Sequence, residues 1–189
     1  MKRSEIQSVE PFGSASLPPV LDACCGSRMM WFDRKHPDVL YMDQRRETLT
    51  VRDRSHGKED GTRTVRIDPD EIADFREMPF PDGSFRLVVF DPPHLVRAGA
   101  QSWMAAKYGK LGPEWRDDLR RGLAECFRVL EPGGVLVFKW NETQVKRKDV
   151  LALTDEQPLF GHTSGRNGLT HWYVFMKQNK EIDRKEKQP

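Results

Sequence analysis

The stretch that decides the fold of this chain is Leu87-Val88-Val89-Phe90-Asp91-Pro92-Pro93-His94. Its four apolar residues are typical of a short buried strand. Two consecutive prolines must end that strand, because proline can neither continue a sheet ladder nor enter a helix interior. In an open parallel α/β sheet, ligands bind at the carboxyl ends of the strands. The turn therefore presents a carboxylate, two backbone carbonyls and a flat ring at a ligand-binding edge, and these groups suit a planar amine.

Segments typical of strands and helices alternate on both sides of this turn. Strands are expected at 20–24, 38–42, 71–74, 85–90 and 135–138, with closing strands at 157–161 and 169–176 and a protruding hairpin formed by 49–51 and 64–67. A short helical segment is expected to follow the first strand through Arg34. A longer helix is expected to begin near Pro113, where apolar residues recur at helical spacing. A βαβ series closed by a hairpin predicts a three-layer α/β domain.

Composition divides the chain into three parts and excludes several classes of protein. We expect a flexible N-terminal arm at 1–17, a patterned domain at 18–176 and a charged, disordered tail at 177–189. The 31 basic and 29 acidic residues nearly balance, so no strongly basic surface announces a nucleic-acid partner. The mean hydropathy is -0.71, and no apolar run approaches the roughly 20 residues of a membrane helix, so no membrane partner is expected. Three cysteines make no disulfide framework, which favours a cytoplasmic location.

Acidic residues also end the other expected strands. Small residues at 22–26 let the backbone approach a ligand closely after the first strand. Asp43 follows about 20 residues later, where nucleotide-binding α/β folds place an acid on the ribose hydroxyls. Asp74-Phe75 ends the third strand. Taken alone, each loop is also explained as an ordinary strand-to-turn transition. Their occurrence in this order before the Asp91 turn is what favours a nucleotide-like ligand.

Together, Asp22-Ala23-Cys24-Cys25-Gly26-Ser27, Asp43, Asp74-Phe75 and Asp91-Pro92-Pro93-His94 resemble the motifs of class I S-adenosylmethionine-dependent methyltransferases. The last motif is similar to the Asp/Asn-Pro-Pro-aromatic motif of enzymes that modify N6 of adenine or N4 of cytosine. The small size is similar to that of orphan phage and prophage DNA adenine-N6 methyltransferases. The resemblance covers residues 18–176. It implies a Rossmann-like, mostly parallel seven-stranded sheet with one antiparallel strand, and S-adenosyl-L-methionine as the cofactor.

The resemblance assigns the cofactor to the first three loops. The cofactor-binding residues that it implies are Asp22, Ala23, Cys24, Cys25, Gly26, Asp43, Asp74 and Phe75. Asp22 would take the ammonium group of the methionine moiety and Asp43 the ribose. Asp74 would lie near the adenine amine, and Phe75 beside the adenine ring. The cysteines lack the spacing of a zinc pair, so no metal site is expected.

The resemblance also makes Asp91, Pro92, Pro93 and His94 the catalytic turn. An exocyclic amine is a poor nucleophile because its lone pair is delocalised into the ring. Hydrogen bonds to the Asp91 carboxylate and the Pro92 carbonyl would hold the nitrogen towards tetrahedral geometry and aim its lone pair at the sulfonium methyl group. His94 departs from the family's aromatic residue, which stacks on the extruded base. An imidazole can stack, hydrogen-bond to the substrate or cap the turn.

Residues after the catalytic turn predict the substrate contacts. The loop 95–112 interleaves basic and aromatic residues, among them Trp103, which suits an extruded nucleic-acid base; a lid over the cofactor is the alternative. At the end of the next strand, Lys139 is expected to contact phosphate. Trp140 is expected to wall the base site, with packing in the core as the alternative.

The expected activity is methyl transfer to adenine N6 in DNA. The alternatives are methylation of an RNA base (rRNA or tRNA), methylation of a protein amide, and a non-catalytic cofactor-binding partner subunit. Sequence-specific DNA methyltransferases carry a target-recognition domain, for which these 189 residues leave no room. Little sequence specificity, a homodimer partner or a structured RNA substrate is therefore expected.

Overall fold

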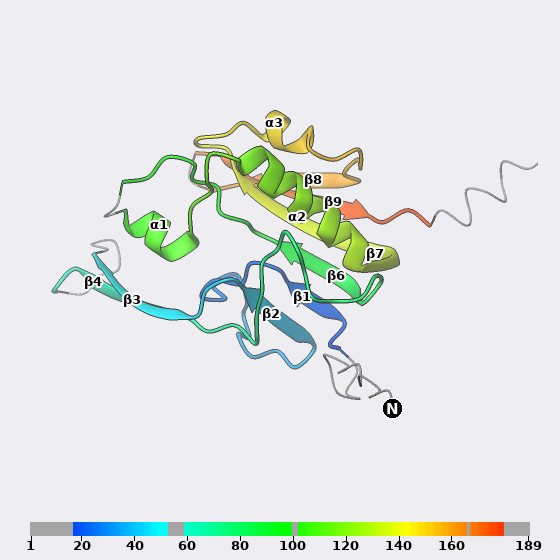
Figure 1. The fold of residues 1–189 in the computed structure, drawn as a ribbon. Coiled ribbons are helices and arrows are strands. Elements are labelled where there is room, and N and C mark those ends of the chain that lie inside the picture. The colour runs from blue at the N-terminus through cyan, green and yellow to red at the C-terminus, as the bar shows by residue number, and fades with distance from the viewer. Residues whose placement is uncertain (1–16, 53–58, 100–101, 166, 180–189) are drawn as a thin grey trace, which may run out of the picture.

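A computed structural model describes residues 17–52, 59–99, 102–165 and 167–179 of the chain (Figure 1). The expected flexible arm at 1–17 and charged tail at 177–189 lie almost entirely outside these ranges, so both stay predictions. Within the described ranges, none of the helices combines the length and the apolar character of a membrane-spanning segment.

A seven-stranded sheet in the order β5-β2-β1-β6-β7-β9-β8 forms the centre of the domain. Its strands are β1 (Val20–Asp22), β2 (Val39–Asp43), β5 (Glu71–Ile72), β6 (Phe85–Phe90), β7 (Leu130–Asn141), β8 (Phe160–Ser164) and β9 (Thr170–Met176). Strands β5, β2, β1, β6 and β7 pair in parallel. In this sheet only β9 runs antiparallel to its neighbours, β7 and β8. The described residues therefore confirm the predicted α/β, Rossmann-like sheet.

The strand order places a ligand-binding crevice between β1 and β6. From β1 the chain builds outward through β2 to β5, then crosses back to add β6 on the other side of β1. Such a reversal leaves the carboxyl ends of the two central strands open, which is where ligands bind in doubly wound sheets. The loop after β1 and the turn after β6 carry the two motifs singled out in the sequence, and the fold brings them together.

Helix α2 (Trp115–Val129) covers β6 and β7 on one face of the sheet (Figure 1). It begins after Glu114, so Pro113 precedes the helix instead of occupying its first turn. Its apolar side packs into the main core of the domain. A Cβ at Gly122 would lie 2.6 Å from the ring of Phe75 and 2.9 Å from that of Phe90. The missing side chain therefore lets α2 approach the sheet closely enough to hold Phe75 in place.

Two shorter segments differ from the sequence prediction. The segment through Arg34 forms turns, so the expected helix after β1 was wrong. Arg28 has a φ of 54°, which a right-handed helix cannot contain, and its guanidinium donates to the Arg34 carbonyl across 2.9 Å. Conversely, the expected loop 95–112 contains a helix, α1 (Trp103–Tyr108), capped by the Ser102 hydroxyl. A third helix, α3 (Arg147–Leu151), follows β7.

The predicted hairpin is confirmed as the antiparallel pair β3 (Glu47–Arg52) and β4 (Thr62–Ile67). It projects from the edge of the domain beside α1 (Figure 1). A separate small core of Val51, Val65 and Ile67 is covered by the α1 residues Trp103 and Ala106. The hairpin therefore acts as the platform on which α1 rests.

Candidate active site

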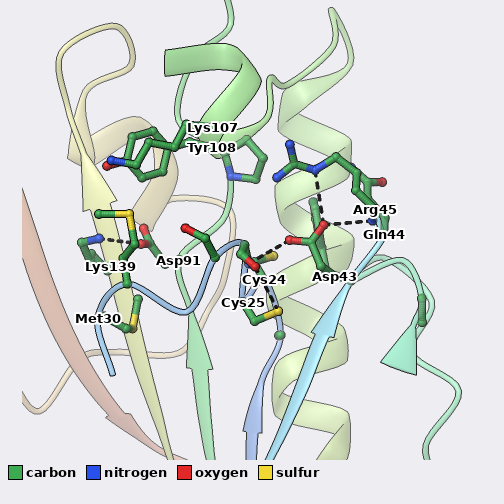
Figure 2. Close-up of a pocket in the computed structure, with 17 residues that line it drawn as sticks. Cys24, Cys25, Met30, Asp43, Gln44, Arg45, Asp91, Lys107, Tyr108 and Lys139 are labelled. Carbon is green, nitrogen blue, oxygen red and sulfur yellow. Dashed lines mark hydrogen bonds and ion pairs between the residues drawn. The ribbon is translucent and has the colours of Figure 1, made fainter. Parts of the chain in front are cut away.

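A pocket of about 220 Å³ opens at the carboxyl ends of β1, β2 and β6 (Figure 2). It is lined by residues of six segments: Ala23, Cys24, Cys25, Gly26, Ser27, Met29, Met30, Asp43, Gln44, Arg45, Ala73, Phe75, Asp91, Pro93, Lys107, Tyr108 and Lys139. Nine of the residues expected at the site are in this lining: Ala23, Cys24, Cys25, Gly26, Asp43, Phe75, Asp91, Pro93 and Lys139. The structure thus gathers most of the predicted site into one cavity.

Backbone hydrogen bonds fix the loop after β1. The Ala23 N–H donates to the Val89 carbonyl across 2.9 Å, and the Cys25 N–H donates to the Met42 carbonyl across 2.8 Å. These two bonds hold the loop between the strands on either side. Burial raises the pKa of the Cys24 and Cys25 thiols, so both remain protonated near neutral pH and act as packing groups.

The Asp43 carboxylate joins three segments at the far side of the pocket. Its Oδ2 accepts from the Gly26 N–H across 2.9 Å, and its Oδ1 accepts from the Arg45 N–H across 3.0 Å. The Arg45 guanidinium contacts Oδ1 across 3.3 Å and also donates to the Ala106 carbonyl of α1 across 3.2 Å. A carboxylate has about four acceptor positions, so Asp43 retains capacity for a ligand hydroxyl. It is an acid that lines the pocket while organising the loops around it.

Asp22 does not line the pocket. Its carboxyl is fully buried and accepts from the Trp31 indole N–H across 2.7 Å and the Cys24 N–H across 3.3 Å. Burial raises the pKa of Asp22 to about 7, although both hydrogen bonds lower it. The expected contact with a ligand ammonium group is therefore not available on the pocket surface, and Asp22 instead braces the loop from behind.

The Asp74 carboxylate also binds a residue outside the pocket lining. Its carboxylate forms an ion pair with Arg76, with Oδ2 lying 2.5 Å from Nη2, and this contact lowers the pKa of Asp74. The neighbouring Phe75 does line the pocket, and its ring lies 5.3 Å from that of Phe90. Of the third predicted loop, only the aromatic residue is therefore in the lining.

Asp91 forms an ion pair with Lys139 at the opposite side of the pocket from Asp43 (Figure 2). Nζ of Lys139 donates to Oδ2 of Asp91 across 2.5 Å. Burial raises the pKa of the Asp91 carboxyl, and the ammonium group of Lys139 opposes that rise. The pair leaves Oδ1 of Asp91 with no hydrogen bond from the described residues.

The other residues predicted for the substrate side lie outside the lining; they are Pro92, His94, Trp103 and Trp140. His94 packs between Tyr108 and Trp140, with ring centroids 6.1 and 6.5 Å away, and burial lowers its pKa, so its imidazole is neutral at pH 7. Trp140 is fully buried and its indole N–H donates to the Val145 carbonyl across 3.0 Å. Trp103 covers the hairpin core. Trp140 therefore packs in the core, which was the alternative interpretation of this residue.

Several lining residues were not assigned to the site from the sequence. They are Ser27, Met29, Met30, Gln44, Arg45, Ala73, Lys107 and Tyr108. Lys107 and Tyr108 belong to the loop whose basic and aromatic composition predicted substrate contacts. Helix α1 directs these two side chains, and not Trp103, into the pocket lining. Arg45 follows Asp43 by two residues, and only the tertiary contact with α1 distinguishes it from a solvated arginine. Among the described residues, no group of three or more His, Cys, Asp or Glu side chains is arranged to hold a metal ion.

Comparison with known proteins identifies the fold. No protein-family model matches the chain, and no curated protein matches its sequence. A TehB-like SAM-dependent methyltransferase from Corynebacterium glutamicum is similar in structure, with a TM-score of 0.50, 18% identity and coverage of 87% of this chain and 83% of that one. The PH0226 protein from Pyrococcus horikoshii has a TM-score of 0.52, 15% identity and coverage of 84% and 81%. The chain therefore has the Rossmann-like fold of the SAM-dependent methyltransferases.

Proposed function

We propose that this chain is a methyltransferase that uses S-adenosyl-L-methionine to methylate an exocyclic amine of a nucleic-acid base, with adenine N6 in DNA as the preferred target. The observation that carries the proposal is the position of Asp91. Its carboxylate lines the same pocket as the loop after β1 and Asp43, on the edge of the sheet where this fold binds ligands. Pro93 of the same turn also lines the pocket, so the turn itself reaches the cavity.

The lining suits the cofactor at each end. The Asp43 carboxylate has acceptor capacity for ribose hydroxyls, and Phe75 and Ala73 offer an apolar surface for a purine ring. The small residues Ala23 and Gly26 leave the backbone open to a ligand. When bound, the cofactor supplies the activated methyl group.

The Asp91 turn would then orient the acceptor amine. Oδ1 of Asp91 and the Pro92 carbonyl accept the two amine hydrogens, while Lys139 holds Oδ2 and fixes the rotation of the carboxylate. The amine nitrogen is thereby drawn towards tetrahedral geometry, and its lone pair points across the pocket. This contribution is positioning and electrostatic preorganisation, with no strong base required. After transfer the nitrogen is acidic and loses its proton, for which Oδ1 is the nearest acceptor in the turn.

Tyr108 replaces the expected aromatic residue of the motif. His94 is packed behind the pocket wall, whereas the Tyr108 ring lines the cavity on the same side as Asp91. Aromatic side chains are the usual partners of extruded bases. We therefore assign to Tyr108 the contact with the target base, in place of His94, Trp103 and Trp140.

The test is the transfer of a labelled methyl group from S-adenosyl-L-methionine to unmethylated DNA and to total RNA in parallel, followed by nucleoside mass spectrometry. N6-methyldeoxyadenosine is the expected product, and the Asp91→Ala variant is the matched negative control. Label in RNA alone would move the acceptor to an RNA base. Label in neither, with cofactor bound, would contradict the proposal and direct attention to a protein amide or to a partner subunit role.

A further inference from the structure

Lys107 is a buried cation that faces the pocket without a counter-charge. It is 5% exposed and belongs to the pocket lining. Its Nζ lies 4.6 Å from the ring centroid of Tyr108 and 5.6 Å from that of Trp103. Among the described residues, no carboxylate and no hydrogen-bond acceptor contacts this ammonium group. The other two cations in the lining differ, because Lys139 is paired with Asp91 and Arg45 with Asp43.

An unpaired buried ammonium group carries a desolvation penalty that its surroundings must offset. The faces of two aromatic rings offset part of it, because the ring quadrupole attracts a cation. A lysine with no structural partner in so buried a position is better explained by a ligand that arrives with negative charge. The pocket therefore has an unfilled position for an anionic group beside α1.

The position of Lys107 favours the substrate as the source of that anion. Helix α1 follows the catalytic turn, and its C-cap Gly109 presses on it, since a Cβ at Gly109 would lie 3.0 Å from Cγ of Pro93. Lys107 and Tyr108 lie on the Asp91 side of the pocket, away from Asp43, to which the cofactor ribose is assigned (Figure 2). A ring and an ammonium group side by side match a base and its phosphate.

We infer that Lys107 binds the backbone phosphate of the nucleotide whose base enters the pocket. This inference rests on the proposed function and adds to it that the substrate is recognised as a nucleotide of a polynucleotide chain, through one buried phosphate contact. A lysine ammonium group is a common point-charge partner of phosphate oxygens. Lys107 thus anchors the strand while Tyr108 contacts the base.

Salt-dependent binding of the Lys107→Met variant tests the inference. The probes are a fluorescein-labelled, adenine-containing DNA oligonucleotide, single-stranded and duplex, and an RNA of the same sequence, each measured by anisotropy from 50 to 200 mM salt. We expect the affinity for the preferred probe to fall about tenfold at the lowest salt, as for loss of a charge-assisted contact. The slope of log affinity against log salt should become shallower by about 0.7 to 0.9, the value of one phosphate contact.

Two further measurements separate this role from a structural one. Without ligand, Lys107→Met should melt at the same temperature as the wild type or higher, because it removes an unpaired buried charge. Its dissociation constant for S-adenosyl-L-methionine should stay within about twofold. Lys107→Arg should keep the wild-type salt slope, since the charge remains.

The matched control is Arg86→Gln, which removes an exposed cation at the opposite end of β6, 3.5 Å from Glu131. An equal decrease in the salt slope of Arg86→Gln would overturn the inference, because the slope would then reflect overall charge.

Weaker cofactor binding with unchanged nucleic-acid binding in Lys107→Met would also overturn it, since the anion would then be the cofactor carboxylate. If the wild type methylates nucleic acid and Lys107→Met keeps both affinity and slope, only this inference fails. A wild type that neither binds nor methylates nucleic acid would overturn the proposed function with it.

Discussion

Lys139 and Asp91 come from adjacent parallel strands and form an ion pair at their carboxyl ends, with Nζ 2.5 Å from Oδ2. The register of β6 and β7, which places Phe90 beside Phe138, sets the two next residues side by side. Lys139 was expected to contact phosphate, but its ammonium group is paired with the Asp91 carboxylate. The pair fixes the orientation of the carboxylate and offsets the cost of burying its charge.

The Lys139→Met variant should therefore change the pH dependence of transfer. In the proposed mechanism, methyl transfer needs ionised Asp91, so the rate should fall as pH drops through the pKa of that carboxyl. Burial already raises this pKa, while Lys139 and His94 lower it. Without Lys139 the pKa rises further, and the acidic limb of kcat/KM should move upward by about 1 to 3 pH units.

The groups near Asp91 define the controls for that profile. His94, which also lowers the pKa of Asp91, and Asp22, whose own pKa is raised by the Asp91 charge, remain in place in the variant. Lys139→Arg should keep the acidic limb near its wild-type position because the opposite charge persists. A lower rate with an unchanged acidic limb in Lys139→Met would show that Lys139 does not tune Asp91.

Gly109→Ala should separate substrate methylation from cofactor binding. Gly109 has a φ of 81°, which an L side chain rarely adopts, and its Cβ would press on Pro93 at 3.0 Å. We expect the unfavourable φ and the contact with Pro93 to be relieved by a shift of α1 away from the Asp91 turn, which would also displace Lys107 and Tyr108. We expect kcat/KM for nucleic acid to fall at least about tenfold, whereas the cofactor dissociation constant measured by calorimetry stays within about twofold. Gly99→Ala, with nothing within 4 Å of its Cβ, is the matched control.

Asp43→Ala should weaken cofactor binding. The substitution removes the proposed ribose acceptor and the acceptor of the Gly26 N–H, so the loop after β1 loses one of its ties to β2. An increase of at least about tenfold in the cofactor dissociation constant is expected from the lost charge-assisted hydrogen bonds. Glu47→Ala is the control, because Glu47 also contacts Arg45, across 3.4 Å, but does not line the pocket. Equal affinities for wild type and Asp43→Ala would remove Asp43 from the ribose assignment.

Stability should depend on pH through Asp22. Its pKa is raised to about 7 in the folded chain, against about 3.9 in an unfolded one. Between these values the folded state holds a proton that the unfolded state has lost, so the contribution of Asp22 to the free energy of unfolding is fully present below pH 4 and is lost as pH rises to 7. The full effect is of the order of 4 kcal/mol.

The Asp22→Asn variant isolates this effect. An amide keeps an oxygen to accept from the Trp31 indole N–H but has no charge to bury. Its melting temperature relative to the wild type should therefore rise between pH 4 and pH 8. Asp38→Asn, at an exposed position, should show no such trend. A constant difference between Asp22→Asn and the wild type across this range would contradict the raised pKa.

Local patterns in the sequence were sufficient to predict the sheet and the edge that carries the pocket. Apolar runs followed by an acid or by prolines locate β1, β2 and β6, since strand ends and turns depend on adjacent residues. The closing hairpin of β8 and β9 follows from the same kind of signal, although β8 spans Phe160–Ser164 and not the expected 157–161. These features depend on neighbours in the chain, which the sequence displays directly.

The direction of individual side chains required the tertiary structure. Asp22 and Asp43 end β1 and β2, and Asp74 follows β5 by two residues. Of the three, only Asp43 lines the pocket, because Trp31 binds Asp22 and Arg76 binds Asp74. Similarly, the choice of Lys107 and Tyr108 over Trp103 depends on how α1 rests on a hairpin about 40 residues away. Contacts between segments distant in the chain determine where these side chains point, so the residue pattern alone could not predict it.

The central claim is that Asp91 orients the acceptor amine, and the most direct measurement compares the wild type with Asp91→Ala in two assays. Calorimetry gives the dissociation constant for S-adenosyl-L-methionine, and a single-turnover assay gives the rate of methyl transfer to the nucleic acid that the wild type prefers. Asp118→Ala, which removes another half-buried ion-paired acid, is the control. We predict cofactor affinity within a few-fold of wild type and a transfer rate lowered by at least about a hundredfold. A near-normal transfer rate in Asp91→Ala would contradict the mechanism.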